Sequence, residues 1–278
     1  MYSPSSRKGF LVQRAAWYSV GLLGSRGLPG GRTSAAPFSD EIWAELHSVF
    51  QDEVGTYDDW ALHRPPDATR EGLGLLLIRQ GCPVAFVKIR KAENCFKLHR
   101  EFEALRLVEK ARPTSFRFTS PLFEGTISEQ RYAGFAPLPV GLHRPPTAPP
   151  LDEILQDIVG ILSSLQKPPD APPDSVPMHG DFTPWNLRQL HRDLYLLDWE
   201  TAGWGPPGAD EVMYRSAATT MRLASIDEYR RAAIRYPEAV AFWIKHWHHR
   251  IDEYVAAVGA TSRHALAIQM LGVLESHD

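Results

Sequence analysis

A proline-rich stretch, PLPVGLHRPPTAPP at residues 137–150, divides the chain into two parts with different patterns. Proline fixes φ and has no N–H, so such a stretch is extended and semi-rigid and cannot continue a helix or an inner strand. The part before it contains strand patterns as well as helix patterns, whereas the part after it is mostly helical by pattern. The sequence therefore predicts two lobes of different composition joined by a linker.

The first lobe reads in the order helix, strand, strand, helix, strand, strand. The first helix, EIWAELHSVF, has Ser39 and Asp40 as alternative N-caps. GLGLLLIRQGCPVAFVKIR reads as two strands joined at 79–82, and SPLFEGTISEQRYAGFAPLPV reads as two more with a turn near Glu129. Between these pairs, KLHREFEALRLVEKA has apolar residues at helical spacing. These patterns predict an α+β fold, with an antiparallel sheet and a helix in the small lobe and a larger, mainly helical second lobe.

The N-terminal residues differ from the rest, being rich in Ser, Gly and Arg. We expect a loosely ordered arm with a short helix at 12–23, and the arginine inside its apolar run argues against export. No segment is apolar enough to span a bilayer. The predicted units are an arm over 1–38, an N-lobe over 39–137, a linker over 138–150 and a C-lobe over 151–278.

The charge and cysteine content narrow the class of protein. A net charge of −3 gives no field that would attract nucleic acid, and no nucleic-acid-binding motif is present. The two cysteines, Cys82 and Cys95, form neither a CxxC pair nor a zinc-ligand spacing. They are most simply free thiols, which favours a reducing compartment, and we expect a cytoplasmic protein.

The residues HGDFTPWN at 179–186, followed by LYLLDWE at 194–200, carry the strongest chemical signal. Phosphoryl transfer needs positioned cations to neutralise phosphate oxygens and a group that orients or deprotonates the acceptor hydroxyl. A lysine ending a strand, a glutamate on the next helix and acidic and amide side chains near the motif could together supply these needs. The candidates are Lys88, Glu101 (with Glu103 as the alternative), Asp181, Asn186 and Asp198.

These motifs resemble those of the aminoglycoside phosphotransferase and choline kinase superfamily, a group of small-molecule kinases with a bilobal, protein-kinase-like fold. The family pattern HGD-x-x-x-x-N matches HGDFTPWN, and I-D-W-E-x-A-x-x-G matches LLDWETAGWG. The separation of seventeen positions between Asp181 and Asp198 leaves room for one short hairpin. The resemblance extends over roughly residues 41–278 and is strongest at 179–205.

The resemblance implies a role for each candidate residue. Asp181 is the catalytic base or orienting carboxylate, and Asn186 and Asp198 hold Mg²⁺ against the ATP phosphates. Lys88 contacts the α- and β-phosphates and is held by Glu101. His179 braces the catalytic loop.

The chain also departs from the protein-kinase pattern. In place of a GxGxxGxV loop it has only Gly72 and Gly74, which we expect to bind the nucleotide phosphates. Phe86, two residues before Lys88, replaces the usual alanine and is expected to shape or stack on the nucleotide base. The family often continues with G-D-P where this chain has Gly-Pro-Pro at 205–207, so Asp210 is the candidate for the later structural aspartate.

The function implied is an ATP-dependent phosphotransferase, with GTP as an alternative donor, acting on an alcohol group of a small molecule. An aminoglycoside, a sugar, an amino alcohol and a lipid-linked glycan are all open as acceptors, and so is the oligomeric state. One alternative is a catalytically silent pseudokinase that binds a ligand or partner. A protein kinase is disfavoured because there is no APE segment or activation-loop-sized insertion after Asp198.

A histidine-rich stretch in the last third, FWIKHWHHR, has two readings. His246, His248 and His249 offer imidazoles, but no HExxH motif or carboxylate cluster accompanies them, so a packed or solvated helix face is favoured over a metal site. By the resemblance, late helices line the acceptor pocket. The loose candidates on that side are Trp243, Trp247, Asp252 and Glu253.

Overall fold

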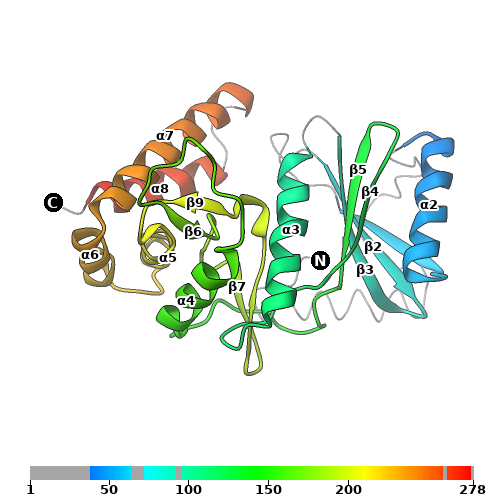
Figure 1. The fold of residues 1–278 in the computed structure, drawn as a ribbon, viewed down its shortest axis with the longest axis horizontal. Helices are drawn as coiled ribbons and strands as arrows, with labels where there is room; N and C mark the ends of the chain where they lie inside the picture. Colours follow the sequence, from blue (N-terminus) through cyan, green and yellow to red (C-terminus); the bar gives the residue numbers. More distant parts are fainter. Residues whose placement is uncertain (1–37, 64–71, 92–94, 259–261, 277–278) are drawn as a thin grey trace.

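The computed structural model describes residues 38–63, 72–91, 95–258 and 262–276. The expected arm over 1–38 and its helix at 12–23 lie outside these residues, apart from residue 38. Within them the chain forms an α+β fold with a sheet-containing lobe and a mainly helical lobe (Figure 1), as the sequence predicts. No helix in these ranges is long and apolar enough to cross a membrane.

The small lobe is built on a five-stranded antiparallel sheet in the order β1-β2-β3-β5-β4. Its strands are β1 (Asp59–His63), β2 (Leu73–Arg79), β3 (Cys82–Lys91), β4 (Pro121–Ile127) and β5 (Gln130–Phe135). The two predicted hairpins are confirmed, and in the first Gln80 and Gly81 have φ of 50° and 75°, as a two-residue hairpin turn requires. Strand β1 is not predicted, because five mostly exposed edge residues give no alternation of apolar and polar side chains.

The two faces of strand β3 have different surroundings. Its odd-numbered residues Ala85, Val87 and Ile89 are buried with the residues of helix α2 (Asp40–Val54), whose N-cap is Ser39. Successive side chains of a strand point to opposite faces, so Phe86, Lys88 and Arg90 face the other side. That side is covered by α3 (Phe96–Ala111), and Figure 1 shows α2 and α3 on opposite faces of the sheet.

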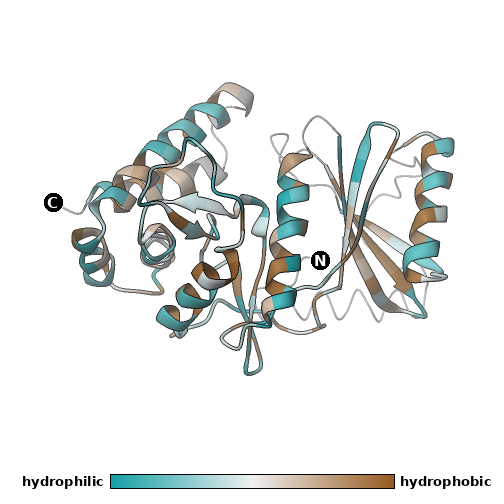
Figure 2. Cartoon of the chain, viewed as in Figure 1, coloured by the Kyte–Doolittle hydropathy of each residue, from teal (hydrophilic) through white to brown (hydrophobic). Residues whose placement is uncertain are grey.

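The second lobe contains five helices and two small ribbons in the described residues. They are α4 (Leu151–Leu162), α5 (Ala209–Thr220), α6 (Ile226–Arg235), α7 (Pro237–Val258), α8 (Ser262–Glu275), the pair β6 (Val176–Met178) and β9 (Gly203–Gly205), and the hairpin β7 (Leu187–Leu190) and β8 (Asp193–Leu196). Figure 2 shows mainly hydrophobic residues on β2 and β3 and mainly hydrophilic residues on the peripheral helix α6. The β7–β8 hairpin lies between Asp181 and Asp198 in the chain, where the sequence spacing leaves room for one short hairpin.

The linker between the lobes has no regular structure from Ala136 to Pro150, but it is attached to the second lobe. Arg144 donates its N–H to the Gln189 carbonyl at 3.0 Å, and Gln189 donates its N–H back to Arg144 at 2.7 Å. Strand β5 ends at Phe135 and α4 begins at Leu151, so the predicted boundaries at 137/138 and 150/151 fall at or beside the ends of this segment. The exact lobe limits stay a prediction.

Candidate active site

The two lobes meet at a cluster of charged side chains around Lys88. Its Nζ donates to both carboxylate oxygens of Glu101, at 2.7 and 2.6 Å, and lies 3.3 Å from Oδ1 of Asp198. Three of the predicted site residues, from β3, α3 and the second lobe, are therefore in direct contact. The choice between Glu101 and Glu103 is also settled, since Glu101 is buried and pairs with Lys88 whereas Glu103 is exposed.

Helix α3 fixes Glu101 in this position. The carboxylate shares the buried face of the helix with Leu98, Phe102 and Leu105. Burial raises the pKa of Glu101, and the Lys88 ammonium counteracts this by favouring the charged form. For Lys88, burial opposes the charge, but the carboxylates of Glu101 and Asp198 outweigh it and raise the lysine pKa. Each of the two buried groups thus favours the charged form of the other, against the cost of burial.

The loop at 179–186 places Asp181 and Asn186 side by side. The Asn186 Nδ2 donates to Oδ2 of Asp181 at 2.8 Å and to its carbonyl at 2.9 Å. Since both amide hydrogens point at Asp181, the carboxamide oxygen is the group that would face a cation. The Leu197 N–H donates to the Asn186 carbonyl at 3.0 Å and so ties this loop to the residue before Asp198.

Two buried side chains brace the same loop. His179 is fully buried; its Nδ1 accepts from the Asp181 N–H at 3.2 Å and its Nε2 donates to the Leu197 carbonyl at 3.1 Å. Asp210, on α5, accepts from the N–H groups of His179 at 2.7 Å and Gly180 at 3.0 Å. The predicted bracing role of His179 agrees with these contacts. From the sequence, Asp210 is only a candidate for the later structural aspartate. In the structure its carboxylate supports the backbone of the loop.

The buried histidine makes stability depend on pH in a defined direction. Burial lowers the pKa of His179 to about 4, from an ordinary 6.5. Between pH 6.5 and pH 4 the unfolded chain takes up a proton on this histidine and the folded chain does not. The contribution of the neutral, buried His179 to folding stability is therefore lost as pH falls through this range. We expect the difference in unfolding free energy between the wild type and His179→Asn to shrink by about 3 kcal/mol from pH 7 to pH 4.

Denaturant titrations at several pH values measure this difference. Burial raises the pKa of Asp210 to about 6, which favours folding at acid pH and opposes the histidine effect. Asp210 is present in both proteins, so its contribution cancels in the comparison. A difference that does not change with pH would contradict a buried neutral His179.

Gly180 allows the loop at 179–186 to lie against the segment that carries Asp198. Its φ is 79°, and a Cβ there would lie 2.4 Å from the Thr201 carbonyl oxygen. Only glycine combines this backbone conformation with so close an approach. The β6–β9 ribbon, which pairs Met178 with Gly203, closes the ends of the two segments.

Asp198 has a left-handed backbone conformation, with φ 66°, and lies immediately before a 3₁₀ turn at Trp199–Thr201. Carboxylate oxygens of Glu101, Asp198 and Glu200 all lie within 4.8 Å of one another. Hard cations such as Mg²⁺ prefer oxygen ligands of this kind, and the Asp198 side chain is one-third exposed and accessible. Glu101 and Glu200 are paired with Lys88 and Arg90 at 2.6 Å, so the oxygens that fit a magnesium ion are those of the more exposed Asp198 and of the Asn186 carboxamide.

The glycines and Phe86 lie on the sheet next to Lys88. Gly74 is paired with Lys88 across β2 and β3, and a Cβ at Gly74 would lie 2.9 Å from the ring of Phe86. Gly72, with φ 107°, comes immediately before β2, and the segment 64–71 that precedes it lies outside the described residues. The structure thus brings these three residues to the lysine side of the sheet but does not describe the loop that leads to them.

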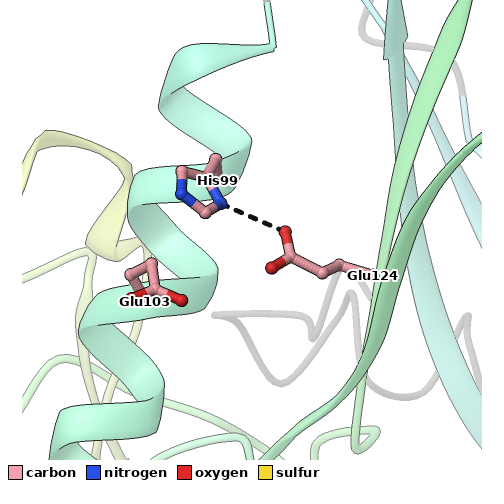
Figure 3. A group of neighbouring side chains, drawn as sticks. All are labelled: His99, Glu103 and Glu124. Carbon is pink, nitrogen blue, oxygen red and sulfur yellow. Dashed lines mark hydrogen bonds and ion pairs between the residues drawn. The ribbon is translucent and has the colours of Figure 1, made fainter.

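A second group of possible metal ligands lies between α3 and β4. Figure 3 shows His99 and Glu103 on one face of α3 with Glu124 opposite, and His99 Nδ1 is 3.2 Å from Glu124 Oε2. The guanidinium of Arg131 contacts both of these atoms, at 3.0 and 2.9 Å. A protein cation already balances this cluster, so we assign it no metal.

The histidine-rich stretch forms part of α7. Trp243 is buried and donates its indole N–H to the Ala209 carbonyl at 2.7 Å, so its candidate acceptor-side role gives way to a core role. Glu253 is an exposed residue paired with His249 at 3.3 Å and Arg250 at 3.8 Å. In the described part of the chain, the clusters able to hold a metal do not include these histidines.

A cavity of about 440 Å³ lies between the linker and helices α5 and α6. Its lining includes Pro149, Tyr214 and Arg215 and none of the site residues predicted from the sequence. This cavity is separate from the charged cluster around Lys88.

Comparisons with solved structures show similarity over most of the chain. The spectinomycin phosphotransferase APH(9)-Ia, solved with ADP and spectinomycin, has 10% identity and a TM-score of 0.57, covering 87% of this chain and 99% of that one. A candidate fructosamine-3-kinase from Haemophilus somnus 129PT has 11% identity and a TM-score of 0.51, covering 84% and 97%. The phosphotransferase APH(2")-IIa, solved with streptomycin and ATP, has 12% identity and a TM-score of 0.50, covering 85% and 99%. At these identities the likeness concerns the fold.

Sequence comparisons give a family as well. No curated protein matches the chain. The model of the phosphotransferase enzyme family (APH), however, matches residues 92–243, which is more than half of the 278 residues and includes Glu101, Asp181, Asn186 and Asp198. The resemblance read from the HGDFTPWN and LLDWETAGWG motifs is thereby confirmed, and the chain belongs to the phosphotransferase enzyme family.

Proposed function

We propose that the protein is an ATP-dependent kinase that transfers the γ-phosphate to an alcohol group of a small molecule. The observation that carries this proposal is the contact of Lys88 with both Glu101 and Asp198 across the two lobes. This arrangement gathers a phosphate-binding cation and a metal-binding carboxylate at one point, with Asp181 held beside Asn186 on the adjoining loop. Phosphoryl transfer depends mainly on such positioning and on electrostatic stabilisation.

Each residue then has a defined role. Lys88 binds phosphate oxygens and is kept extended by Glu101, while Asp198 and the Asn186 oxygen hold Mg²⁺. When bound, Mg²⁺ neutralises charge on the phosphate oxygens. Asp181 accepts the proton of the acceptor hydroxyl or orients that hydroxyl toward the phosphate.

We further propose that the nucleotide base lies beside the segment from Phe135 to Leu138, with Phe86 shaping its pocket and Gly72 and Gly74 near the phosphates. The N–H of Ala136 is donated to Ser120, and proline at 137 has no N–H, which leaves Leu138 to offer a backbone donor to the base. ATP is the proposed donor and GTP the alternative. The solved relatives with ADP or ATP support a nucleotide here.

The acceptor class is proposed only as a small molecule with a hydroxyl group. The similar proteins that were solved with spectinomycin or streptomycin support an acceptor of this size, and a sugar or amino alcohol fits the same chemistry. Free thiols at Cys82 and Cys95 and the need for ATP support a cytoplasmic location.

The experiment that tests this function has two stages. Thermal shift with Mg-ATP and Mg-GTP first establishes nucleotide binding, and ADP release is then measured across aminoglycosides, sugars and amino alcohols. Turnover with an acceptor supports the kinase. Nucleotide binding without turnover on any acceptor would favour the pseudokinase alternative, and absence of binding would reject the nucleotide site.

Replacing Lys88 with alanine should weaken ATP use more than it weakens folding. The loss of one charge-assisted contact to phosphate corresponds to about 1.5–3 kcal/mol, or roughly a 10- to 150-fold rise in KM for ATP. Steady-state kinetics measure the first effect and denaturant titration the second. An unchanged kcat/KM would eliminate the proposed role.

The buried partner of Lys88 provides a control for this variant. In Lys88→Ala the carboxylate of Glu101, only 4% exposed, loses its counter-charge, and this lowers stability. Adding Glu101→Gln removes the unpaired charge. The double variant should therefore regain stability without regaining ATP use, and recovery of both would mean that the lysine acts only through folding.

A further inference from the structure

A second ion pair joins the lobes next to the first. Arg90 NH2 lies 2.6 Å from Oε2 of Glu200, and each side chain is about one-fifth exposed. Lys88 and Arg90 are two residues apart on β3 and so share a face, and Asp198 and Glu200 are likewise two residues apart. The strand and the segment 198–201, which we call the metal segment, are therefore joined by two parallel contacts.

The Lys88–Asp198 and Arg90–Glu200 contacts differ in whether the proposed reaction uses their side chains. In the proposed function, Lys88 and Asp198 both bind the metal–nucleotide complex, so their mutual contact competes with their roles. Arg90 and Glu200 have no role in that proposal, so the reaction does not require their contact to break. On this basis we propose that Arg90 is a positioning residue, whose ion pair with Glu200 keeps the metal segment, and with it Asp198, in register with strand β3.

The surroundings of Arg90 support a fixed position for its side chain. A Cβ at Gly72 would lie 3.0 Å from Cγ of Arg90, so the arginine stem runs closely past the glycine backbone. A further link from the N-lobe reaches the residue that follows the segment, because Arg100 NH1 donates to the Ala202 carbonyl at 3.2 Å. Two arginines of the small lobe thus hold the C-terminal side of the metal segment.

The Arg90–Glu200 pair also affects the position of Asp198 electrostatically. The carboxylates of Glu101, Asp198 and Glu200 lie within 4.8 Å of one another, and like charges at this distance repel. Arg90 balances the charge of Glu200. Without it, repulsion between Glu200 and Asp198 would displace the segment from the position in which Asp198 faces Lys88.

The test compares nucleotide affinity with and without magnesium, using isothermal titration calorimetry with ADP. Arg90→Ala is expected to bind Mg-ADP roughly tenfold more weakly than the wild type, in the range of couplings between contacting residues. In EDTA, where Asp198 has no cation to hold, wild type and variant should bind ADP alike. Arg90→Lys keeps the charge and should restore part of the Mg-ADP affinity.

A matched control separates positioning from general loss of an ion pair. Arg215 forms a 2.5 Å pair with Glu228 inside the second lobe and is similarly buried, so Arg215→Ala should leave Mg-ADP affinity unchanged. A double-mutant cycle with Glu200→Ala should be strongly non-additive, since Arg90 acts through Glu200.

The outcomes also distinguish this inference from the function on which it rests. If the wild type fails to bind Mg-ADP, the proposed function itself is wrong. If the wild type binds but Arg90→Ala binds Mg-ADP equally well, loses affinity equally in EDTA, or is additive with Glu200→Ala, the positioning role is overturned and the kinase proposal stands.

Discussion

Replacing Asp198 with asparagine is expected to abolish turnover and to weaken Mg-ATP binding at the same time. The carboxylate is the proposed anionic metal ligand, and an amide oxygen without the negative charge holds Mg²⁺ less tightly. Asparagine is the right replacement because Asp198 has φ 66°, and asparagine tolerates this left-handed conformation better than alanine does. Nucleotide titrations with and without Mg²⁺, together with ADP release, measure both effects.

The chain offers a control aspartate close in sequence. Asp193, at the start of β8, is exposed and makes a 3.3 Å pair with Arg117 at the surface. Asp193→Asn should leave Mg-ATP binding and turnover unchanged, as expected for an exposed pair. If Asp198→Asn behaves like this control, Asp198 is not a metal ligand and the kinase assignment fails.

Replacing Asp181 with asparagine should produce the second-largest effect, of a different kind. Asp181 is proposed to act on the acceptor hydroxyl, so kcat should fall by ~10²–10⁴-fold, the usual contribution of a positioned base. Mg-ATP affinity should be retained. An asparagine carbonyl can still accept the hydrogen bond from Asn186 Nδ2, which spans 2.8 Å to the Asp181 carboxylate, so the neighbouring ligand should stay in place.

The comparison of these two variants tests the division of roles between neighbouring acids. Asp181→Asn losing Mg-ATP as completely as Asp198→Asn would show that Asp181 belongs to the metal site. Full activity in Asp181→Asn would remove it from the proton-handling role.

The candidate site residues could be chosen from the sequence because they lie in short, ordered motifs, and the structure brings Lys88, Glu101 and Asp198 into contact. Asp181 and Asn186 are five residues apart in one loop, and the β7–β8 hairpin accounts for the distance to Asp198. The alternation of strands around Gln80 and the linker prolines predicted the sheet and the lobes. These patterns involve residues close together in the chain, so they can be read from a single sequence.

The features that the sequence missed depend on tertiary contacts. The N-lobe edge strand β1 is too exposed to show a pattern, and the choice between Glu101 and Glu103 depends on which side of α3 faces β3. The pair of Arg90 and Glu200 spans 110 positions. Its only sequence signal is the spacing of two from Lys88 and from Asp198, which becomes informative once the strand direction is known.

The β6–β9 ribbon has a consequence for how such a chain can diversify. Because Val176–Met178 pairs with Gly203–Gly205, the thirty consecutive residues from 176 to 205 form a closed ring that contains the proposed proton acceptor and both proposed metal ligands. Helices α6, α7 and α8 lie outside this ring. If these helices line the acceptor pocket, as the family resemblance implies, substitutions at their exposed positions change the acceptor pocket without altering the strand pairing that closes the ring.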